Sequence, residues 1–236
     1  AAQVGRGLLD GLRVYGAAQE GGFMGGAVGE VHGAKLVGML RRAIDDRAGA
    51  VLLVLESGGV RLHEANAGLF AEFDFMRRAL VGVFALSEVM RAMLDAREAG
   101  IPVVALVGGS NGCFGGMGIS ARCANTVIMS EEGRLAMSGP EVIETANGVE
   151  EFDSRDRALV WRTTGGKHRY LLGDCQVLVP DDTSAFRRAA IQAIADVKAS
   201  GSQLTLEDLL REQDMLGRRI ELAEGLHEPM EIWQRL

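Results

Sequence analysis

Short apolar runs alternate with amphipathic segments along most of the chain. Five runs have the length of strands, namely RVYGAAQ at 13–19, VLLVLE at 51–56, IPVVALV at 101–107, TVIMS at 126–130 and QVLV at 176–179. A continuous apolar run is typical of a strand that is covered on both faces of a parallel sheet. Glycine-rich turns follow the first three runs, and apolar residues at helical spacing follow those turns. The repeated order of strand, turn and helix predicts an α/β fold.

The segments between the runs predict helices, at 30–46, at about 64–97, at 117–125 and at 140–147. RLAMS at 134–138 predicts one more short strand. From about residue 182 the pattern is helical, with one helix to about Lys198 and a second after the cap-like Thr205. No linker composition interrupts the sequence, so we expect one domain over 1–236 with a helical C-terminal part from about 183.

Composition supports a packed domain with many close backbone contacts. With 236 residues, of which 47% are hydrophobic, the chain is long enough to bury one sizeable core. Its 32 glycines are about twice the usual share, and they are scattered through apolar sequence rather than set in a repeat. Such glycines indicate places where other backbone, or a ligand, approaches the chain closely.

Charge and cysteine content exclude several classes of function. A formal net charge of -7 offers no broad electrostatic footprint for nucleic acid or for an anionic membrane. Cys113, Cys123 and Cys175 are odd in number without C-x-x-C spacing, which fits a reducing compartment, and no apolar run reaches the length of a membrane span. We therefore expect a cytoplasmic protein that binds neither nucleic acid nor membrane. The chain begins AAQVGRG without methionine, which is consistent with residues missing upstream.

Two glycine turns follow successive predicted strands and carry the candidate chemistry. SGGVR at 57–61 follows the second run, and GCFGGMG at 112–118 follows the third. Backbone N–H groups gathered at strand ends and helix starts stabilise negative charge, and two such positions commonly form an oxyanion hole. A side chain at either place would hold the ligand away. The alternative is that the glycines only let helices pack tightly on the sheet, and glycine content does not decide between the two.

Several long motifs together resemble one enzyme family. The strings FMGGAVGEVHGAK, ESGGVRLHEANAGL, GCFGGMGIS, MSGPEVIE and TTGGKHRYLLGDC are similar to the β subunit of biotin-independent malonate decarboxylase, over about residues 20–180. That family is in the carboxyltransferase branch of the crotonase-like superfamily. The resemblance implies a crotonase-like ββα superhelix with C-terminal helices. The segment FAEFDFMRRALVGVFALSEVM departs from the family in length and aromatic content, which leaves the helix boundaries there open.

The resemblance also implies an activity and a set of partners. The family decarboxylates a malonyl thioester carried on an acyl-carrier subunit and releases acetyl thioester and carbon dioxide through an enolate. The implied partners are a homologous γ subunit, the acyl-carrier protein and an acyl-carrier transferase subunit. The implied prosthetic group, phosphoribosyl-dephospho-CoA, belongs to the acyl-carrier subunit, so we expect no cofactor bound directly by this chain.

Carried over by position, the resemblance assigns the backbone donors of the oxyanion site to two glycine pairs. One pair is Gly58 and Gly59, and the other is Gly115 and Gly116. The glycines at 25–26 match the family's FMGG motif, and we expect them to serve close packing rather than catalysis.

Two side chains beside the first glycine pair are candidates for binding substrate. Arg61 has the charge to hold a malonyl carboxylate or a phosphate, and the alternative is an ion pair with Glu64 or Glu56. His63 is a candidate donor of the proton that quenches the enolate, and the alternatives are an ordinary surface histidine and protonation by water. The sequence leaves both roles open.

Other reactive residues are expected to be structural. His32 lies within one helical turn of Glu30 and Lys35 without the spacing of a metal site, so we expect no metal and a solvated or interfacial histidine. Cys113 precedes a glycine pair but has no activating base, which favours a small apolar filler. For the basic cluster at 167–169, binding of phosphates or of acidic partner residues and a solvated turn both stay open.

Two further functions fit the same sequence. A biotin-dependent acyl-CoA carboxyltransferase would use the same oxyanion geometry, although the C-x-x-C…C-x-x-C zinc ribbon of some such subunits is absent from this sequence. A catalytically silent subunit would only shape the site of the γ subunit and dock the carrier. Substitution of the two glycine pairs separates the scaffold from the enzymes, because a scaffold tolerates small changes that preserve assembly.

Overall fold

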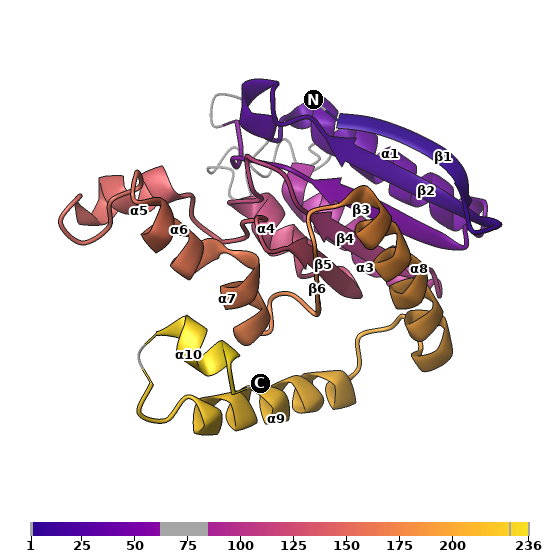
Figure 1. Ribbon diagram of the computed structural model, residues 1–236. Coiled ribbons are helices and arrows are strands. Elements are labelled where there is room, and N and C mark those ends of the chain that lie inside the picture. Colours follow the sequence, from indigo (N-terminus) through magenta and orange to yellow (C-terminus); the bar gives the residue numbers. More distant parts are fainter. Residues whose placement is uncertain (1, 62–84, 227, 236) are drawn as a thin grey trace.

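The computed structural model describes residues 2–61, 85–226 and 228–235. Within these ranges a six-stranded sheet has the order β1-β2-β3-β4-β5-β6, with helices on both of its faces (Figure 1). Its strands are β1 (Ala2–Leu9), β2 (Leu12–Gln19), β3 (Ala50–Leu55), β4 (Val103–Val107), β5 (Thr126–Ser130) and β6 (Val177–Val179). Each of the five predicted apolar runs overlaps a strand, which confirms the predicted α/β class.

The first strand forms a hairpin that the apolar pattern did not predict. β1 pairs antiparallel with β2, and Asp10 and Gly11 form the turn with φ of 50° and 76°. A two-residue hairpin turn of this kind requires positive φ at both central residues. Because β1 lies at the sheet edge with most of its side chains exposed, its sequence carries no continuous apolar run. All other neighbouring strands are parallel.

The described helices largely follow the predicted order. They are α1 (Glu30–Asp45), α3 (Ala85–Glu98), α4 (Gly116–Ala121), α5 (Pro140–Asn147), α6 (Arg157–Thr164), α7 (Gly166–Leu171), α8 (Thr183–Ser200), α9 (Leu206–Leu222) and α10 (Pro229–Trp233), with a 3₁₀ turn η1 (Met24–Gly26). The helix predicted at 117–125 is shorter than expected, and residues 64–84 of the one predicted at 64–97 lie outside the described residues. Helices α6, α7 and α10 were not predicted, and each has eight residues or fewer.

The parallel strands are buried on both faces, as their continuous apolar sequences predicted. On one face α1, α3 and α4 cover the sheet and enclose Leu40, Leu53 and Met93. On the other face α8 covers Val104 and Ile128 (Figure 1). Burial of each such side chain contributes roughly 1.5–3 kcal/mol. These two layers fix the strand register and therefore the level at which each strand ends.

A second layer of single bridges follows the main sheet. Val28 bridges Val60, Ser57 bridges Cys113, and Cys113 bridges Leu135. Val28, Cys113 and Leu135 each follow a strand of the sheet and precede a helix, namely α1, α4 and α5. The chain thus repeats the order of strand, short extended segment and helix, which is the ββα repeat that the resemblance implied.

The strand predicted at 134–138 is reduced to two bridge residues. Arg134 bridges Gly165 in antiparallel sense, whereas Leu135 bridges Cys113 in parallel sense. Because the two residues pair with different neighbours, no ladder of consecutive pairs forms, and the prediction of a regular strand is wrong.

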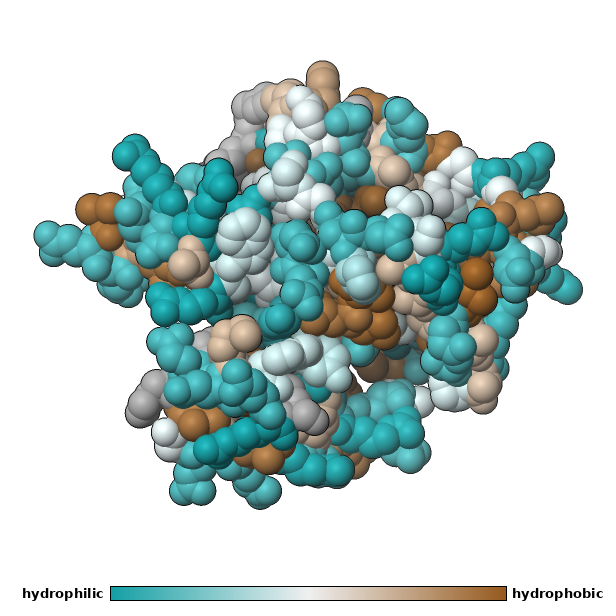
Figure 2. All heavy atoms as spheres, in the orientation of Figure 1, coloured by the Kyte–Doolittle hydropathy of each residue, from teal (hydrophilic) through white to brown (hydrophobic). Residues whose placement is uncertain are grey.

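The C-terminal helix α9 is attached to the rest of the chain by an ion pair. α9 begins with a capping box between Thr205 and Asp208, as the cap-like threonine predicted. No residue of α9 is buried, and Figure 2 shows apolar groups exposed over the C-terminal helices at the lower left. Arg122 pairs with Glu212 of α9 at 2.5 Å.

The prediction of a single domain with a helical part from about 183 stays a prediction.

Among the described helices, none has both the length and the apolar sequence that crossing a bilayer demands.

Candidate active site

The two glycine loops predicted from the sequence meet at the carboxyl ends of β3 and β4. The N–H of Ser57 donates to the Gly112 carbonyl at 2.8 Å, and the N–H of Phe114 donates back to the Ser57 carbonyl at 2.7 Å. A Cβ placed on Gly115 would lie 3.0 Å from the Cα of Gly59, so the two loops touch backbone to backbone. Parallel strands end at the same edge of a sheet, and ligands of α/β proteins bind at that edge.

The glycines at 25–26 lie against the first of these two loops. The N–H of Gly58 donates to the Gly25 carbonyl at 2.7 Å. A Cβ on Gly26 would collide with the carbonyl of Glu56. Close packing therefore accounts for Gly26, whereas a Cβ on Gly25 would meet nothing within 4 Å, and the role predicted for the pair stays a prediction.

The hydrogen bonds of the four candidate amides differ. Gly58 donates to Gly25, Gly59 donates to the Ser57 hydroxyl at 3.2 Å, and Gly115 donates to the Met137 carbonyl at 3.0 Å. The N–H of Gly116, the first residue of α4, has no acceptor within the part of the chain that the structure describes. An N–H in the first helical turn lacks an intrahelical partner and lies at the positive end of the helix dipole.

Packing explains the absence of a side chain at Gly116 but not at Gly59. A Cβ on Gly116 would collide with the side chain of Leu86 in α3, which is fully buried. At Gly59 a Cβ would meet nothing within 4 Å, but the φ of +129° is one that other residues rarely adopt. Packing against Leu86 is therefore enough to explain the glycine at 116. At position 59 packing does not explain it, and the backbone conformation does.

Arg61 lies against the loop that precedes α1. Its Nε donates to the Ala27 carbonyl at 3.1 Å, and its guanidinium lies 5.4 Å from the centre of the Phe23 ring. Its role in holding a carboxylate or phosphate stays a prediction. His63 and the alternative ion-pair partner Glu64 lie outside the described residues.

A buried amide and imidazole support the start of the first glycine loop. The Nε2 of Gln19 lies 3.1 Å from the Nε2 of His32, and its Oε1 accepts from the N–H of Glu56 at 3.0 Å. Burial, followed by nearby positive charges, lowers the pKa of His32 to about 4, so the imidazole is neutral at physiological pH. Because the Gln19 amide donates to Nε2, the His32 proton lies on Nδ1. The Gln19 side chain on β2 thus binds the backbone of Glu56, the residue that follows β3, and extends the contact between the two strands by one residue.

The prediction that His32 is solvated or interfacial is wrong, because only 3% of the residue is exposed. Its spacing of four from Leu36 and of eight from Leu40 places it on the buried face of α1. That spacing was the signal in the sequence that could have located it.

The basic cluster at 167–169 is used within the chain. Lys167 pairs with Glu131 at 3.2 Å and lies 5.6 Å from the centre of the Trp233 ring. Arg169 pairs with Asp174 at 3.0 Å. Both residues belong to or adjoin α7, so the segment is a helix rather than a solvated turn.

Cys113 has the properties of a packed filler. It is fully buried at the bridge between the two loops, and burial raises the pKa of its thiol to about 12. Such a thiol has no appreciable thiolate at neutral pH. Across the described residues, no group of three or more His, Cys, Asp or Glu side chains is placed to hold a metal ion.

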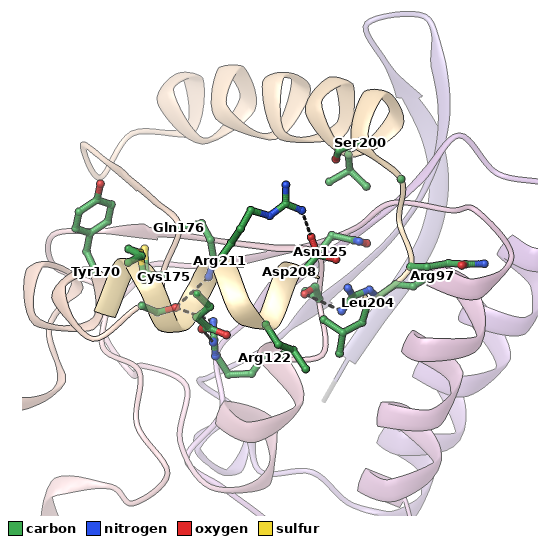
Figure 3. A pocket seen from close by; sticks show the side chains of 18 of the residues that line it. Arg97, Arg122, Asn125, Tyr170, Cys175, Gln176, Ser200, Leu204, Asp208 and Arg211 are labelled. Carbon is green, nitrogen blue, oxygen red and sulfur yellow. Dashed lines mark hydrogen bonds and ion pairs between the residues drawn. The ribbon is translucent and has the colours of Figure 1, made fainter. Parts of the chain in front are cut away.

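A separate cavity of about 470 Å³ lies between α9 and the body (Figure 3). Its arginines bind chain groups. Arg97 donates to the carbonyls of Ser202 and Cys123, each at 2.9 Å, and Arg122 donates to that of Gly173 at 2.8 Å. None of the residues that line this cavity belongs to the glycine loops. The arginines that line this cavity therefore hold the C-terminal segment to the rest of the chain.

A sequence-family comparison decides the family. Residues 2–190 match the model of the carboxyl transferase domain. The chain belongs to the carboxyl transferase domain family. A curated member of this kind, the malonyl-S-ACP:biotin-protein carboxyltransferase MADC of Malonomonas rubra, is 45% identical over 183 residues, which cover 72% of this chain and 53% of that protein. The chain thus spans about half the length of this curated relative.

Two solved structures of Pseudomonas malonate decarboxylase resemble this carboxyl transferase chain. The hetero-tetramer in complex with malonate has a TM-score of 0.77 at 36% identity and covers 100% of this chain and 80% of that chain. The MdcD-MdcE hetero-dimer has a TM-score of 0.69 at 37% identity and covers 90% of this chain and 85% of that chain. The predicted resemblance to malonate decarboxylase and the predicted crotonase-like fold are confirmed.

Proposed function

We propose that this chain supplies part of the active site of a malonate decarboxylase complex. The reaction is decarboxylation of a malonyl thioester carried on an acyl-carrier subunit to acetyl thioester and carbon dioxide. The observation that carries the proposal is the contact between Gly59 and Gly115, which unites the two glycine loops at one edge of the sheet. Family membership and the likeness to malonate decarboxylase along the whole chain support it.

The chemistry requires a site for an oxyanion. When the bond to the carboxylate breaks, its electron pair moves onto the thioester, and the thioester oxygen becomes an enolate oxygen. Each preorganised donor aimed at that oxygen contributes on the order of 3 kcal/mol to the transition state. In our proposal Gly116 supplies one amide, because it has no acceptor among the described residues, and Gly59 supplies the second by exchanging its 3.2 Å bond to the Ser57 hydroxyl.

The remaining steps use one proton. The enolate carbon takes a proton from water or from His63, and acetyl thioester results. Arg61 is the proposed cation for the malonyl carboxylate or for a phosphate of the carrier arm. A firm hold on the leaving carboxylate would stabilise the ground state, so we assign Arg61 to orientation of the substrate.

The proposed assembly is heteromeric. The two Pseudomonas structures are named as a hetero-tetramer and a hetero-dimer. We assign to this chain a homologous γ subunit, an acyl-carrier protein and an acyl-carrier transferase subunit as partners. The carrier brings the phosphoribosyl-dephospho-CoA group, and this chain binds no cofactor of its own.

A second function is favoured by one specific observation. The Malonomonas relative is named as a carboxyltransferase that acts between malonyl-S-ACP and a biotin protein. The same enolate would form in that reaction, but the carboxyl group would pass to biotin instead of leaving as carbon dioxide.

One assay tests both proposals. The chain is purified together with its natural partners, and malonyl thioester labelled in the free carboxyl group is added with or without biotin. We expect labelled carbon dioxide at the same rate in both reactions. If the malonyl thioester loses its labelled carboxyl group only when biotin is present, and the label is recovered on biotin, the result would favour the carboxyltransferase. No turnover of malonyl thioester in either reaction would contradict both.

A further inference from the structure

One carboxylate links the two glycine loops. Glu56 directly follows β3 and precedes the loop that holds Gly58 and Gly59. The second loop comprises residues 108–115, between β4 and α4. The Oε1 of Glu56 accepts a hydrogen bond from the backbone N–H of Asn111 at 3.1 Å. The side chain at the start of one loop thus binds the backbone in the middle of the other.

Glycines on two sides leave room for this carboxylate. A Cβ on Gly109 would lie 3.1 Å from Oε1 of Glu56, and one on Gly21 would lie 2.6 Å from its Oε2. The Cβ on Gly21 would also collide with the side chain of Asn111. A side chain at Gly21 would therefore displace the carboxylate, and one at Gly109 would press against it.

The backbone of Glu56 is itself held in place. Its N–H donates to Oε1 of Gln19 at 3.0 Å, and the amide of Gln19 contacts the buried His32. Its carbonyl packs against Gly26, where an added Cβ would collide with it. The carboxylate therefore extends from a fixed backbone, and the length of the side chain determines whether it reaches Asn111.

The charge of Glu56 is used on a backbone group. Within the described residues its carboxylate forms no ion pair with a lysine or arginine. A carboxylate that accepts from an N–H makes a hydrogen bond roughly twice as strong as a neutral one. The later part of the second loop is held by backbone bonds to Ser57. Arg134 also donates to the carbonyl of Ser110, but it follows β5 and so does not join the two glycine loops.

We propose that Glu56 is a positioning residue that sets the place of the second glycine loop relative to the first. It acts through the hydrogen bond to Asn111, which requires an acceptor oxygen at the right reach. The catalytic consequence rests on the proposed function, because the loop leads directly to the Gly116 amide assigned to the oxyanion. A donor that is displaced by about 1 Å loses much of its effect on the rate, since stabilisation of the transition state depends on preorganised geometry.

Three substitutions separate reach from charge. Glu56→Gln keeps the length of the side chain and an acceptor oxygen but removes the charge. Glu56→Asp keeps the charge but is shorter by one methylene, so it no longer reaches Asn111. Glu56→Ala removes both. A role in proton transfer, or one through charge alone, requires aspartate to function better than glutamine, whereas we expect the opposite order.

Hydrogen exchange followed by mass spectrometry measures the loop without any assay of activity. It is applied to the purified chain, alone and in the assembled complex. We expect peptides that cover residues 109–115 to exchange about tenfold or more faster in Glu56→Asp and Glu56→Ala than in the wild type, and within about threefold of it in Glu56→Gln. Peptides from α8 report on global unfolding and should exchange as in the wild type.

Glu144→Ala is the matched control for the loss of a carboxylate. Glu144 also accepts from a backbone N–H, that of Ser154 at 2.8 Å, but in a different loop. Its replacement should speed exchange around Ser154 and leave residues 109–115 unchanged.

Turnover of malonyl thioester by the assembled complexes tests the catalytic consequence. We expect kcat of Glu56→Asp and Glu56→Ala to fall by about tenfold or more at a nearly unchanged KM, and that of Glu56→Gln to stay within about threefold of the wild type. A wild-type complex without turnover would contradict the proposed function. The exchange result would then still decide whether Glu56 holds the loop.

The proposal is overturned if Glu56→Asp shows wild-type exchange at residues 109–115, or if Glu56→Gln behaves as Glu56→Ala does. It is also overturned if the aspartate variant frees the loop but keeps a normal kcat, because the position of the loop would then not matter for catalysis. Faster exchange in α8 as well as in the loop would contradict it too, since Glu56 would then stabilise the whole fold.

Discussion

Gly59 and Gly115 touch backbone to backbone, since a Cβ on Gly115 would lie only 3.0 Å from the Cα of Gly59. Both have positive φ, at +129° and +63°. A side chain at Gly115 would press against the loop that holds Gly59, and one at Gly59 would need a backbone conformation that other residues rarely adopt. The loops after β3 and β4 therefore act as one unit, and that unit carries the amide groups assigned to the oxyanion.

Replacement of Gly59 by alanine should destabilise the chain through backbone strain alone. The Cβ would meet nothing within 4 Å, but an alanine at φ of +129° is strained by about 1–3 kcal/mol. Gly5→Ala is the matched control, because Gly5 is exposed on β1, an added Cβ there would also meet nothing within 4 Å, and its φ is not positive. Urea unfolding of the two variants measures the difference, and equal stability would contradict the backbone conformation at Gly59.

The buried His32 should make stability depend on pH. In the unfolded chain His32 takes up a proton with the ordinary histidine pKa of about 6.5, whereas in the folded chain its pKa is about 4. The free energy of unfolding should therefore fall as the pH falls from 6.5 to 4, by up to about 3 kcal/mol from this group. Stability above pH 6.5 is unaffected by it.

His32→Gln keeps a neutral polar group opposite Gln19 and removes the titration. Urea unfolding at pH 7 and at pH 4.5 should show a smaller loss of stability in this variant than in the wild type. An equal loss in both proteins would mean that His32 is not the buried neutral group described.

Cys113 and Cys175 should be inert in the folded chain. Burial raises the pKa of Cys113 to about 12 and that of Cys175 to about 11, so almost no thiolate forms at pH 8. Treatment with iodoacetamide at pH 8 should leave turnover unchanged, while the chain unfolded in urea should be labelled at its three cysteines. Rapid inactivation with label on Cys113 would show that this thiol is reactive.

The sequence predicted those strands whose burial leaves a simple pattern of apolar residues. β3, β4 and β5 are covered on both faces, so their residues are apolar without interruption. β1 pairs only with β2 and exposes most of its side chains, so its sequence has no apolar run that would predict a strand. In the segment at 134–138 only Arg134 and Leu135 form bridges, and sequence does not reveal that they pair with two different neighbours.

The site was predictable to the level of the loops but not of single atoms. Glycine pairs at two strand ends indicated where backbone gathers, and the parallel register brought them together. Which amide keeps an unused donor depends on the positions of the Gly25 and Met137 carbonyls, which come from other segments. The Gln19 and His32 pair was missed because its hydrogen bonds join β2, β3 and α1 across the fold.

The structure changes how the amide of Gly116 must be tested. Gly116→Ala alone is ambiguous, because its Cβ would collide with Leu86. In a Leu86→Ala background that space is open, and Gly116→Ala keeps the N–H whereas Gly116→Pro removes it. Gly116 is the first residue of α4, a position at which proline fits a helix well. The two double variants therefore differ mainly in one backbone donor.

Turnover per assembled complex in these two double variants is the most direct test of the central claim. With malonyl thioester as substrate, Gly116→Pro/Leu86→Ala should have a kcat about 100-fold or more below that of Gly116→Ala/Leu86→Ala, with little change in KM for the carrier. That result is expected because the enolate charge develops in the transition state. Equal kcat in two well-assembled complexes would contradict the assignment of the Gly116 amide to the oxyanion.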